Sequence, residues 1–516
     1  MYSFPITGVY CIKMYNQNLA LFAWLQAQTQ DVIDELDFVS KIRDYYYSTQ
    51  PDVLTPRQRE YMGLKDGDEE PRDNFIDDTV QLISERLYIT GWQASHISET
   101  ESQKLNLAIQ TIMENNNMDS TQDDVYTSAL RDGCSFIIVD YDTSKAGLEG
   151  VRFQVLPSAY INYDNGNEQI MGVRLHKDTY GKVTFASNRY VDYDITNDGP
   201  INKDIKINQF LTIYNPDKIE RYIMRGAVQD SVNSDFAQAG WERYTENPGD
   251  PWPIPWTTNG QAGGEPLGVP VFEFETPDGS VINRSLLSIQ DAVNRNFSDT
   301  IALDYLHGFA LLVITGVALD DDEVLSPGRV INIQDNEASV NRIAGESSSN
   351  LHETKRTYIQ SVARKTTIPI HLIFPTSTPP TGESLKRMES RIINRCLRIQ
   401  RNYGKAWINI AEMSLKLALV FGQQTGLLLD AINQGSVNPI WAKPYSATVE
   451  ENATEAAAYK ASGLPDEYGW AEVWGLTPQE IAKYSALKQS ATNQAVVSAV
   501  SALQQVEQAE QEQENG

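Results

Sequence analysis

The sequence contains very little cysteine for its length. Its 516 residues include three cysteines, Cys11, Cys134 and Cys396, and no two of them form a CxxC pair. An odd number at wide spacing argues against a disulfide framework and is typical of a reducing cytoplasm. Cys134 and Cys396 lie in apolar patterns, which predicts small buried hydrophobic side chains rather than reactive thiols.

Histidine is also scarce, and the usual catalytic motifs are absent. The five histidines show no metal-ligand spacing, and neither a GxxxxGK[ST] phosphate loop nor a GxSxG nucleophile turn occurs. One acidic run, Asp320, Asp321 and Asp322 followed by Glu323, has the hard oxygen atoms that Mg²⁺ or Ca²⁺ prefers. An exposed acidic turn is the simpler interpretation. We therefore expect no catalytic residue, no metal and no cofactor.

Long hydrophobic runs are missing as well. The most apolar stretch, residues 309–319, is much shorter than the roughly 20 residues that a membrane-spanning helix needs. The N-terminus lacks the basic region and the apolar region of a signal peptide. The pattern of the helix that follows does not extend before Met14, which makes Met14 a second candidate for the first residue. We expect no membrane partner.

Positive charge is in short supply. The chain has 42 Lys and Arg against 69 Asp and Glu, a formal net charge of −27. This balance argues against general adhesion to nucleic acid or to anionic membranes, both of which require cationic surface. It remains compatible with DNA that must pass without binding. If several copies formed a ring, their mutual repulsion would make assembly depend on salt or on divalent ions.

The segment from residue 281 to 421 has the most informative order of elements. Its pattern predicts a helix over 283–307, a strand pair over 311–316 and 329–333, a helix over 350–365, a proline-rich loop and a long helix over 383–421. Two long helices joined through a small β element make a rod, which one chain rarely buries alone. The pattern therefore favours part of a larger assembly.

The rest of the chain predicts an α+β protein. Helical patterns cover 18–48, 101–115 and 120–132, and another helix is expected to begin at an N-cap Asp73 or Asn74. A polar linker covers 49–72, and an extended stretch from residue 87 is expected to stop at Gly91. Alternating β patterns continue from 135 to about 275, interrupted by a Trp- and Pro-rich surface loop over 241–268. A last amphipathic helix is expected over 478–510.

Basic residues concentrate on one stripe of the long helix. Six recur at spacings of four, four, three, three and four: Arg387, Arg391, Arg395, Arg398, Arg401 and Lys405. Two interpretations are open, contact with a DNA backbone and ion pairing with acidic faces of the same or the next subunit. The abundance of carboxylates in the chain favours the second.

Several short patterns, taken in order, resemble the portal proteins of tailed bacteriophages. They are IRDYYYSTQP, NFIDDTVQLISERLYITGW, LLSIQDAVNRNFSDTIALDYLHGFALLVITG, IPIHLIFPTSTPPTGESLKRMES and NYGKAWINIAEMSLKLA. The similarity spans about residues 33–419 and is closest to the portal family of long-tailed phages with an SPP-type head–tail connector. Thr381-Gly382 stands where that family usually has Ser-Gly, a harmless change because either hydroxyl can cap a helix.

The resemblance implies a portal fold built from named regions. They are a mixed wing domain (1–280), a first stem helix (281–308), a small α/β clip (309–349), a second stem helix (350–365), a tunnel loop (366–382), a long kinked wing helix (383–423) and a helical C-terminal crown (424–516). Of the tunnel loop, Ile373, Phe374, Thr376, Ser377 and Thr378 are the expected channel residues, with the hydroxyl side chains facing DNA and apolar ones packing against neighbouring loops. Asp320, Asp321 and Asp322 become candidate contacts of the clip.

The resemblance also implies a function. A homo-oligomeric ring, usually of twelve subunits, occupies one capsid vertex of the virion after assembly in the bacterial host cytoplasm. Double-stranded DNA passes through it during packaging and ejection. Its expected partners are the terminase large subunit, a head–tail adaptor, and the major capsid and scaffold proteins. Two rival interpretations are a neck or baseplate ring without DNA passage, and a metal-dependent hydrolase that uses Asp320–Asp322.

Overall fold

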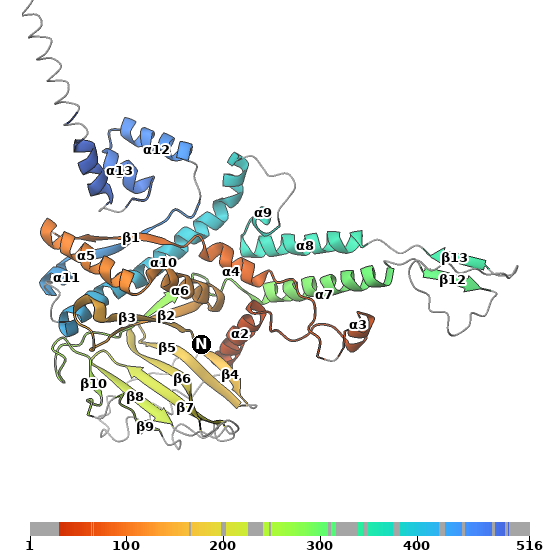
Figure 1. The fold of residues 1–516 in the computed structure, drawn as a ribbon, viewed down its shortest axis with the longest axis horizontal. Helices are drawn as coiled ribbons and strands as arrows, with labels where there is room; N and C mark the ends of the chain where they lie inside the picture. Colours follow the sequence, from red (N-terminus) through yellow and green to blue (C-terminus); the bar gives the residue numbers. More distant parts are fainter. Residues whose placement is uncertain are drawn as a thin grey trace, which may run out of the picture.

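The structure of the chain, a computed structural model, describes residues 30–62, 64–65, 67–96, 98–164, 167–197, 203–224, 241–246, 249–307, 311–315, 339–343, 348–374, 382–422, 429–445, 449–476, 480–490 and 494. Within this part the chain mixes helices and sheets in an α+β arrangement (Figure 1). A body of helices and sheets carries a pair of long helices that projects from one side, and a small helical unit that stands above it.

Helices dominate the first part of the described chain. Their bounds are α2 (Gln30–Tyr46), α3 (Pro56–Tyr61), α4 (Ile76–Ser84), α5 (Glu99–Asn115) and α6 (Met118–Asp132). The predicted helix over 18–48 is confirmed from Gln30 to Tyr46, and residues 18–29 lie outside the described residues. The polar linker contains α3, which was not predicted. A capping box stabilises the N-terminus of α3, in which the side chains of Thr55 and Gln58 each accept a hydrogen bond from the backbone N–H of the other residue.

The N-cap of α4 differs from the prediction. Phe75, rather than Asp73 or Asn74, occupies the cap position and has no side-chain cap bond. Asn74 still contributes, because its Oδ1 accepts the N–H of Ile76 at 2.9 Å. Its amide nitrogen donates to the carbonyls of Tyr45 and Tyr46 at the end of α2, so Asn74 joins two helices.

Residues 134–275 contribute two antiparallel sheets to the body. A three-stranded sheet has the order β11-β2-β3, with β2 (Cys134–Tyr141), β3 (Val151–Pro157) and β11 (Val271–Glu275). The short 3-10 helix η1 (Gly147–Gly150) precedes β3. The larger, seven-stranded sheet contains β4 (Tyr160–Asp164), β5 (Asn167–Lys177), β6 (Val183–Asn197), β7 (Lys203–Tyr214), β8 (Lys218–Met224), β9 (Glu242–Arg243) and β10 (Ile254–Pro255). Strands β2 to β8 and β11 confirm the expected antiparallel β region, whereas β9 and β10 lie in the segment over 241–268 that was predicted as a loop.

The Trp- and Pro-rich insert was predicted as a surface loop, but its strands β9 and β10 both pair with β8 of the large sheet. Trp241 and Trp252 pack on a small cluster of Leu211, Ile213 and Tyr222 on the outer face of the large sheet. Trp256 is buried in the main core, and its indole N–H donates to the carbonyl of Gly268 at 2.8 Å. The insert therefore covers a sheet face that would otherwise expose apolar side chains.

A third, two-stranded sheet corrects the prediction for Gly91. Strand β1 (Ile89–Ser95) continues through Gly91 and pairs antiparallel with β14 (Ser436–Trp441), with a register shift between Ile89 and Gly91. Glycine here marks a bulge rather than the end of a strand. The pairing ties the first third of the chain to the segment after the long helix.

The segment from 284 to 422 contains the predicted rod, in which α7 and α8 are joined through β12 and β13, whereas α10 packs in the body. Its elements are α7 (Arg284–His307), β12 (Leu311–Thr315), β13 (Ser339–Ile343), α8 (Ser349–Thr366), α9 (Ile370–Ile373) and α10 (Gly382–Gly422). Strand β13, which was not predicted, pairs with β12 from Leu311↔Ile343 to Thr315↔Ser339. The predicted partner over 329–333 lies outside the described residues. Helix α11 (Leu429–Gln434) follows α10.

The main core lies along the buried face of α10. Ile392, Cys396, Ile399, Tyr403 and Trp407 are all at most 1% exposed. Cys396 is thus the buried apolar side chain that was expected, and burial raises its thiol pKa to about 11. Cys134 is half-buried, and burial raises its pKa to about 12. Neither thiol is an activated nucleophile.

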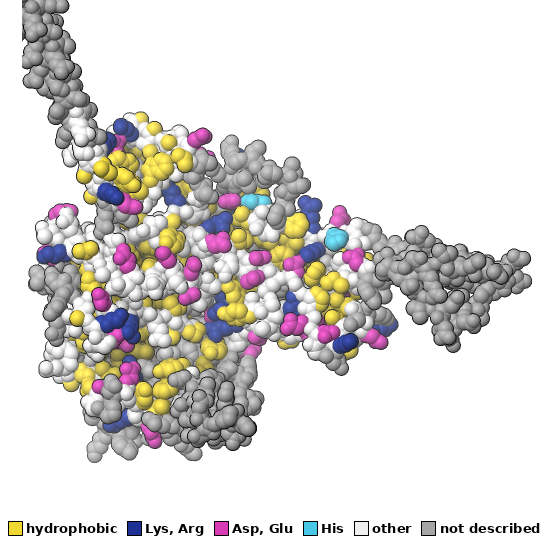
Figure 2. Space-filling view, viewed as in Figure 1, with side chains coloured by type: hydrophobic (Ala, Val, Ile, Leu, Met, Phe, Trp, Pro, Cys, Tyr) yellow, Lys and Arg dark blue, Asp and Glu magenta, His cyan; other side chains and the backbone are white. Residues whose placement is uncertain are grey.

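The C-terminal helices form the small unit above the body. They are α12 (Val449–Ala461), α13 (Asp466–Glu472) and a helical stretch over 480–490. The predicted helix over 478–510 is therefore confirmed only over 480–490, and most of its remainder lies outside the described residues. Figure 2 shows hydrophobic side chains gathered on this unit, in keeping with the exposure of Val449, Tyr468 and Trp474.

Candidate functional site

The two long helices α7 and α8 lie side by side and extend away from the body, with β12 and β13 beyond their far end (Figure 1). Helix bounds at 284–307 and 349–366 agree closely with the sequence prediction. Many exposed positions remain along α8, where few residues other than Ile359, Val362 and Thr366 are buried. A helix pair with so little burial has surface available for a partner.

Residues 73–75 clamp the base of this helix pair. The N–H of Asp73 donates to Asn294 Oδ1 at 3.1 Å, and its carbonyl accepts from Gln290 Nε2 at 2.6 Å. The N–H of Phe75 donates to Gln290 Oε1 at 3.0 Å. The carboxylate of Asp73 pairs with Lys355 of α8 at 2.5 Å. One short segment therefore fixes both long helices to the body.

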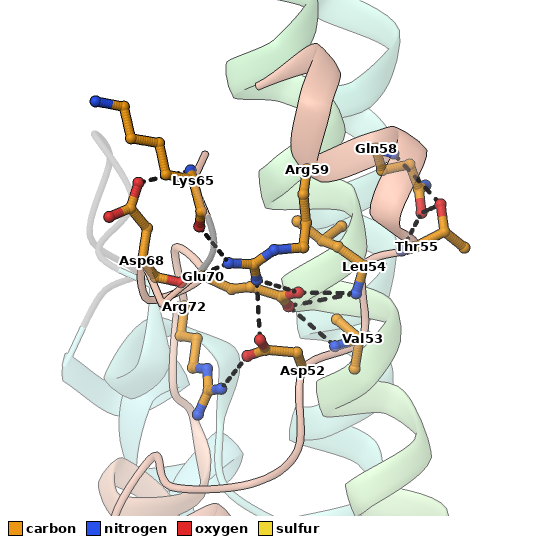
Figure 3. Close-up of polar contacts among 10 residues, drawn as sticks. All are labelled: Asp52, Val53, Leu54, Thr55, Gln58, Arg59, Lys65, Asp68, Glu70 and Arg72. Atoms are coloured by element: carbon orange, nitrogen blue, oxygen red, sulfur yellow. Dashed lines mark hydrogen bonds and ion pairs between the residues drawn. The ribbon is translucent and has the colours of Figure 1, made fainter. Parts of the chain in front are cut away.

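A second polar network connects side chains and backbone groups within residues 49–72, beside helices α7 and α8 (Figure 3). The Glu70 side chain is 2% exposed, and its carboxylate accepts the N–H groups of Val53 and Leu54 at 2.9 and 3.1 Å. Arg59 pairs with Glu70 at 3.2 Å and with Asp52 at 2.9 Å. It also donates to the carbonyl of Asp68 at 2.7 Å. The predicted linker is thus a fixed element rather than a loose connection.

Sequence reasoning missed both networks. A usable signal was present in α7, because Gln290 and Asn294 are four residues apart on a face that is otherwise apolar. Amide side chains on a buried helical face need partners, since a buried polar group without one is costly. That argument would have predicted a polar segment packed against α7, but not which one.

The proline-rich loop begins at a strained residue. Thr367, which ends α8, has a φ of 65°, a left-handed conformation that is uncommon outside glycine. Arg395 of α10 donates to the carbonyl of Thr366 at 2.7 Å, and so satisfies the end of α8. Burial lowers the pKa of the Arg395 guanidinium. This arginine therefore positions the start of the loop.

Short helix α9 holds the next part of the loop against α10. His371 Nε2 lies 3.1 Å from Glu389 Oε1 of α10. Ile368 is 1% exposed, and Ile370, Leu372 and Ile373 are half-buried against the main core. Phe374 differs, because it is 45% exposed. Of the candidate channel residues, Ile373 thus packs inward and Phe374 outward, while Thr376, Ser377 and Thr378 lie outside the described residues.

The six basic residues of α10 do lie on one stripe, which we call the α10 stripe, but they do not act alike. Arg395 is half-buried and caps α8, as described above. Arg398 pairs with Asp278 in the turn after β11, where both side chains are largely exposed. Arg387 is exposed and has an interaction of its own. Arg391, Arg401 and Lys405 are exposed, and no described carboxylate lies within ion-pair distance of them.

No described feature supports chemistry at a catalytic centre. In the part of the chain that the structure describes, no group of three His, Cys, Asp or Glu side chains is placed to hold a metal ion. Asp320, Asp321 and Asp322 lie outside the described residues. Among the described helices, none has both the length and the hydrophobicity that crossing a membrane requires. The described residues instead form a mechanical arrangement, a clamped rod and an anchored loop.

Comparison with known proteins gives one family match. The family model described as "Phage portal protein, SPP1 Gp6-like" matches residues 29–495. No curated protein matches the sequence. Among solved structures, a chain from "Virion of native gene transfer agent (GTA) particle" is similar over 85% of this chain and 99% of that chain, with 12% sequence identity and a TM-score of 0.40.

Proposed function

Because the chain belongs to the SPP1 Gp6-like family of phage portal proteins, we propose that it forms a ring at one capsid vertex through which double-stranded DNA enters and leaves. The observation that carries this proposal is the length of the family match. Residues 29–495 include every described helix and strand, from α2 to α13. The family is one of structural virion proteins rather than of enzymes, so the energy for packaging would come from a separate terminase motor.

The described elements have a natural assignment in such a ring. Residues 1–280 form the wing, 281–308 and 350–365 the two stem helices, and 309–349 the clip. Residues 366–382 form the tunnel loop, 383–423 the long wing helix, and 424–516 the crown. The clamp at residues 73–75 supports this assignment, because a stem that transmits force to a motor or a tail must be fixed to the wing.

The partners follow from the same assignment. The clip, with Asp320–Asp322 as candidate contacts, would bind the terminase large subunit during packaging and a head–tail adaptor afterwards. Major capsid and scaffold proteins would surround the wing. The net charge of −27 suits a channel that must not hold DNA, because each cationic contact with a phosphate adds affinity by counterion release. We expect a mostly acidic channel surface, and a uniformly basic one would contradict this explanation.

Single-particle mass measurement with negative-stain images tests the proposed ring. Twelve copies of the 57.9-kDa chain weigh about 695 kDa. We expect rings near that mass with an open centre, and more of them at moderate than at low salt because of the acidic charge. Rings without a central hole would favour a neck or baseplate component, and a compact monomer in every condition would contradict the proposal.

Phe374→Ala is expected to impair DNA packaging. Among the described residues of the loop, the other apolar side chains pack within the chain, whereas Phe374 is exposed and can contact a neighbouring loop. Burying a phenylalanine side chain stabilises by about 1.5–3 kcal/mol, and a ring would lose that contact in every copy. Packaged and retained DNA per virion is the measurement. Tyr468→Ala, a similarly exposed aromatic on α13, is the control, and equal packaging by both variants would mean that Phe374 has no such contact.

A further inference from the structure

The part of the α10 stripe without described ion pairs has the composition of a protein interface. The three residues of this part are two arginines and one lysine, Arg391, Arg401 and Lys405. Met388, on the same part of the helix, is 42% exposed. Arginine and methionine are enriched in protein–protein interfaces, whereas lysine is depleted there. A surface that only tracks a phosphate backbone has no need of an exposed apolar side chain.

A groove lies at the end of this surface. It has a volume of about 350 Å³ between α8, α9 and α10. Its lining is mainly apolar or small, including Ala363, Ile368 and Pro369, together with Met388 and Arg391 of α10. The cationic and apolar parts of the surface are therefore continuous. Such a combination suits an acidic protein surface that also carries apolar side chains.

An acidic surface of that kind occurs on the same chain. Glu114, at the end of α5, and Asp119, Asp123 and Asp124, on the first turns of α6, are exposed. No described cation lies within ion-pair distance of them. Burial and then the neighbouring Asp124 and Asp119 raise the pKa of Asp123, as crowded carboxylates do when no cation neutralises them. Within one chain, this acidic face and the α10 stripe form no ion pair with each other.

We infer that the α10 stripe, through Arg391, Arg401 and Lys405, binds the acidic face at Glu114, Asp123 and Asp124 of a second copy of this chain. The inference rests on the proposed ring. In a head-to-tail ring, each interface joins two different faces of the chain, so a cationic face on one copy can bind a separate acidic face on the next. Arg398 already pairs with a carboxylate, that of Asp278 in its own chain. At a net charge of −27, a second copy of the chain supplies many carboxylates, whereas the same charge disfavours contact with DNA.

Charge reversal tests this interface. The variant R391E/R401E/K405E places like charges opposite each other, which disfavours association of the two faces. We expect the protein concentration needed for half-maximal ring assembly to rise roughly 100-fold, measured by single-particle mass at several salt concentrations. K145E/K182E/K483E changes three exposed lysines elsewhere by the same total charge, and should assemble nearly as the wild type does. Thermal unfolding of each variant monitors folding.

The compensating variant makes the test specific. E114K/D123K/D124K alone should also assemble poorly, and its combination with R391E/R401E/K405E should restore rings by exchanging the two charges. Failure of the combination to restore assembly would contradict this pairing of faces. Normal rings from R391E/R401E/K405E with less packaged DNA would mean that the stripe contacts DNA instead. A wild-type chain that never forms rings would contradict the proposed function and this interface with it.

Discussion

Replacing Asp132 with alanine is expected to lower the free energy of unfolding by about 3–5 kcal/mol. The Asp132 side chain is 0% exposed and pairs with two arginines. Arg43 Nη2 of α2 lies 2.7 Å from Oδ2, and Arg131 Nε lies 2.7 Å from Oδ1. Removal of the carboxylate leaves two largely buried guanidinium groups without an anion, which costs more than the ion pairs themselves contribute.

Aromatic rings surround both arginines, so their guanidinium groups cannot readily turn toward solvent. Arg43 stacks 4.2 Å from the centre of the Tyr160 ring of β4. Arg131 lies near the rings of Tyr46 and Tyr47 and donates to the hydroxyl of Tyr47 at 2.9 Å. The network thus joins α2, α6 and the edge of the large sheet. Its loss should loosen the packing between these elements as well as lower the stability of the chain.

Urea unfolding of the purified chain, followed by tryptophan fluorescence, measures this effect. Glu85→Ala is the control, because Glu85 is a carboxylate residue that is exposed, has no described ion pair and lies outside the acidic face at Glu114, Asp123 and Asp124. We expect a change within about 0.5 kcal/mol for the control. Similar unfolding midpoints for both variants would show that the buried network contributes little.

The same network shows which contacts the sequence can predict and which it cannot. The pattern IRDYYYSTQP marked the tyrosines as a family resemblance, without a physical role. In the structure Tyr46 and Tyr47 surround Arg131, and Tyr45 donates to Asp291 of α7 at 2.7 Å. These contacts join residues that are from 84 to 246 positions apart. Local pattern cannot predict them, because the partner's position depends on the whole fold.

Elements with strong periodicity were predicted well, and weakly marked ones were not. Helices α7, α8 and α10 begin and end within a residue or two of the prediction, because long apolar stripes mark them. Strand β13 has the sequence SVNRI, which is less apolar than the stretch over 329–333. An apolar pattern therefore predicts a strand over 329–333 and not at β13. Sequence alone marked the spacing of the α10 stripe, whereas the roles of Arg395 and Arg398 depend on Thr366 and Asp278.

Replacing Trp407 with alanine is expected to lower the free energy of unfolding by about 4–6 kcal/mol, from a cavity and an orphaned hydroxyl together. Trp407 is fully buried on α10 and contacts Trp92, Phe153 and Phe274. Its indole N–H donates to the hydroxyl of Tyr126 at 2.8 Å. Because burial raises the pKa of Tyr126, that hydroxyl stays neutral and still needs a partner.

Two further substitutions separate the contributions at Trp407 and locate their consequence. Trp407→Phe keeps much of the ring volume but removes the N–H, so we expect it to cost about half as much as alanine. Trp474→Ala removes a tryptophan that is 41% exposed, and should change stability by less than about 1 kcal/mol. Urea unfolding ranks the three variants. Helix α10 carries the stripe and also Arg395 and Glu389, which contact the start of the proline-rich loop. Trp407→Ala should therefore also lose ring assembly, measured by single-particle mass, at temperatures where Trp474→Ala retains it. Equal stability of the alanine variants would mean that α10 is held by contacts other than this aromatic cluster.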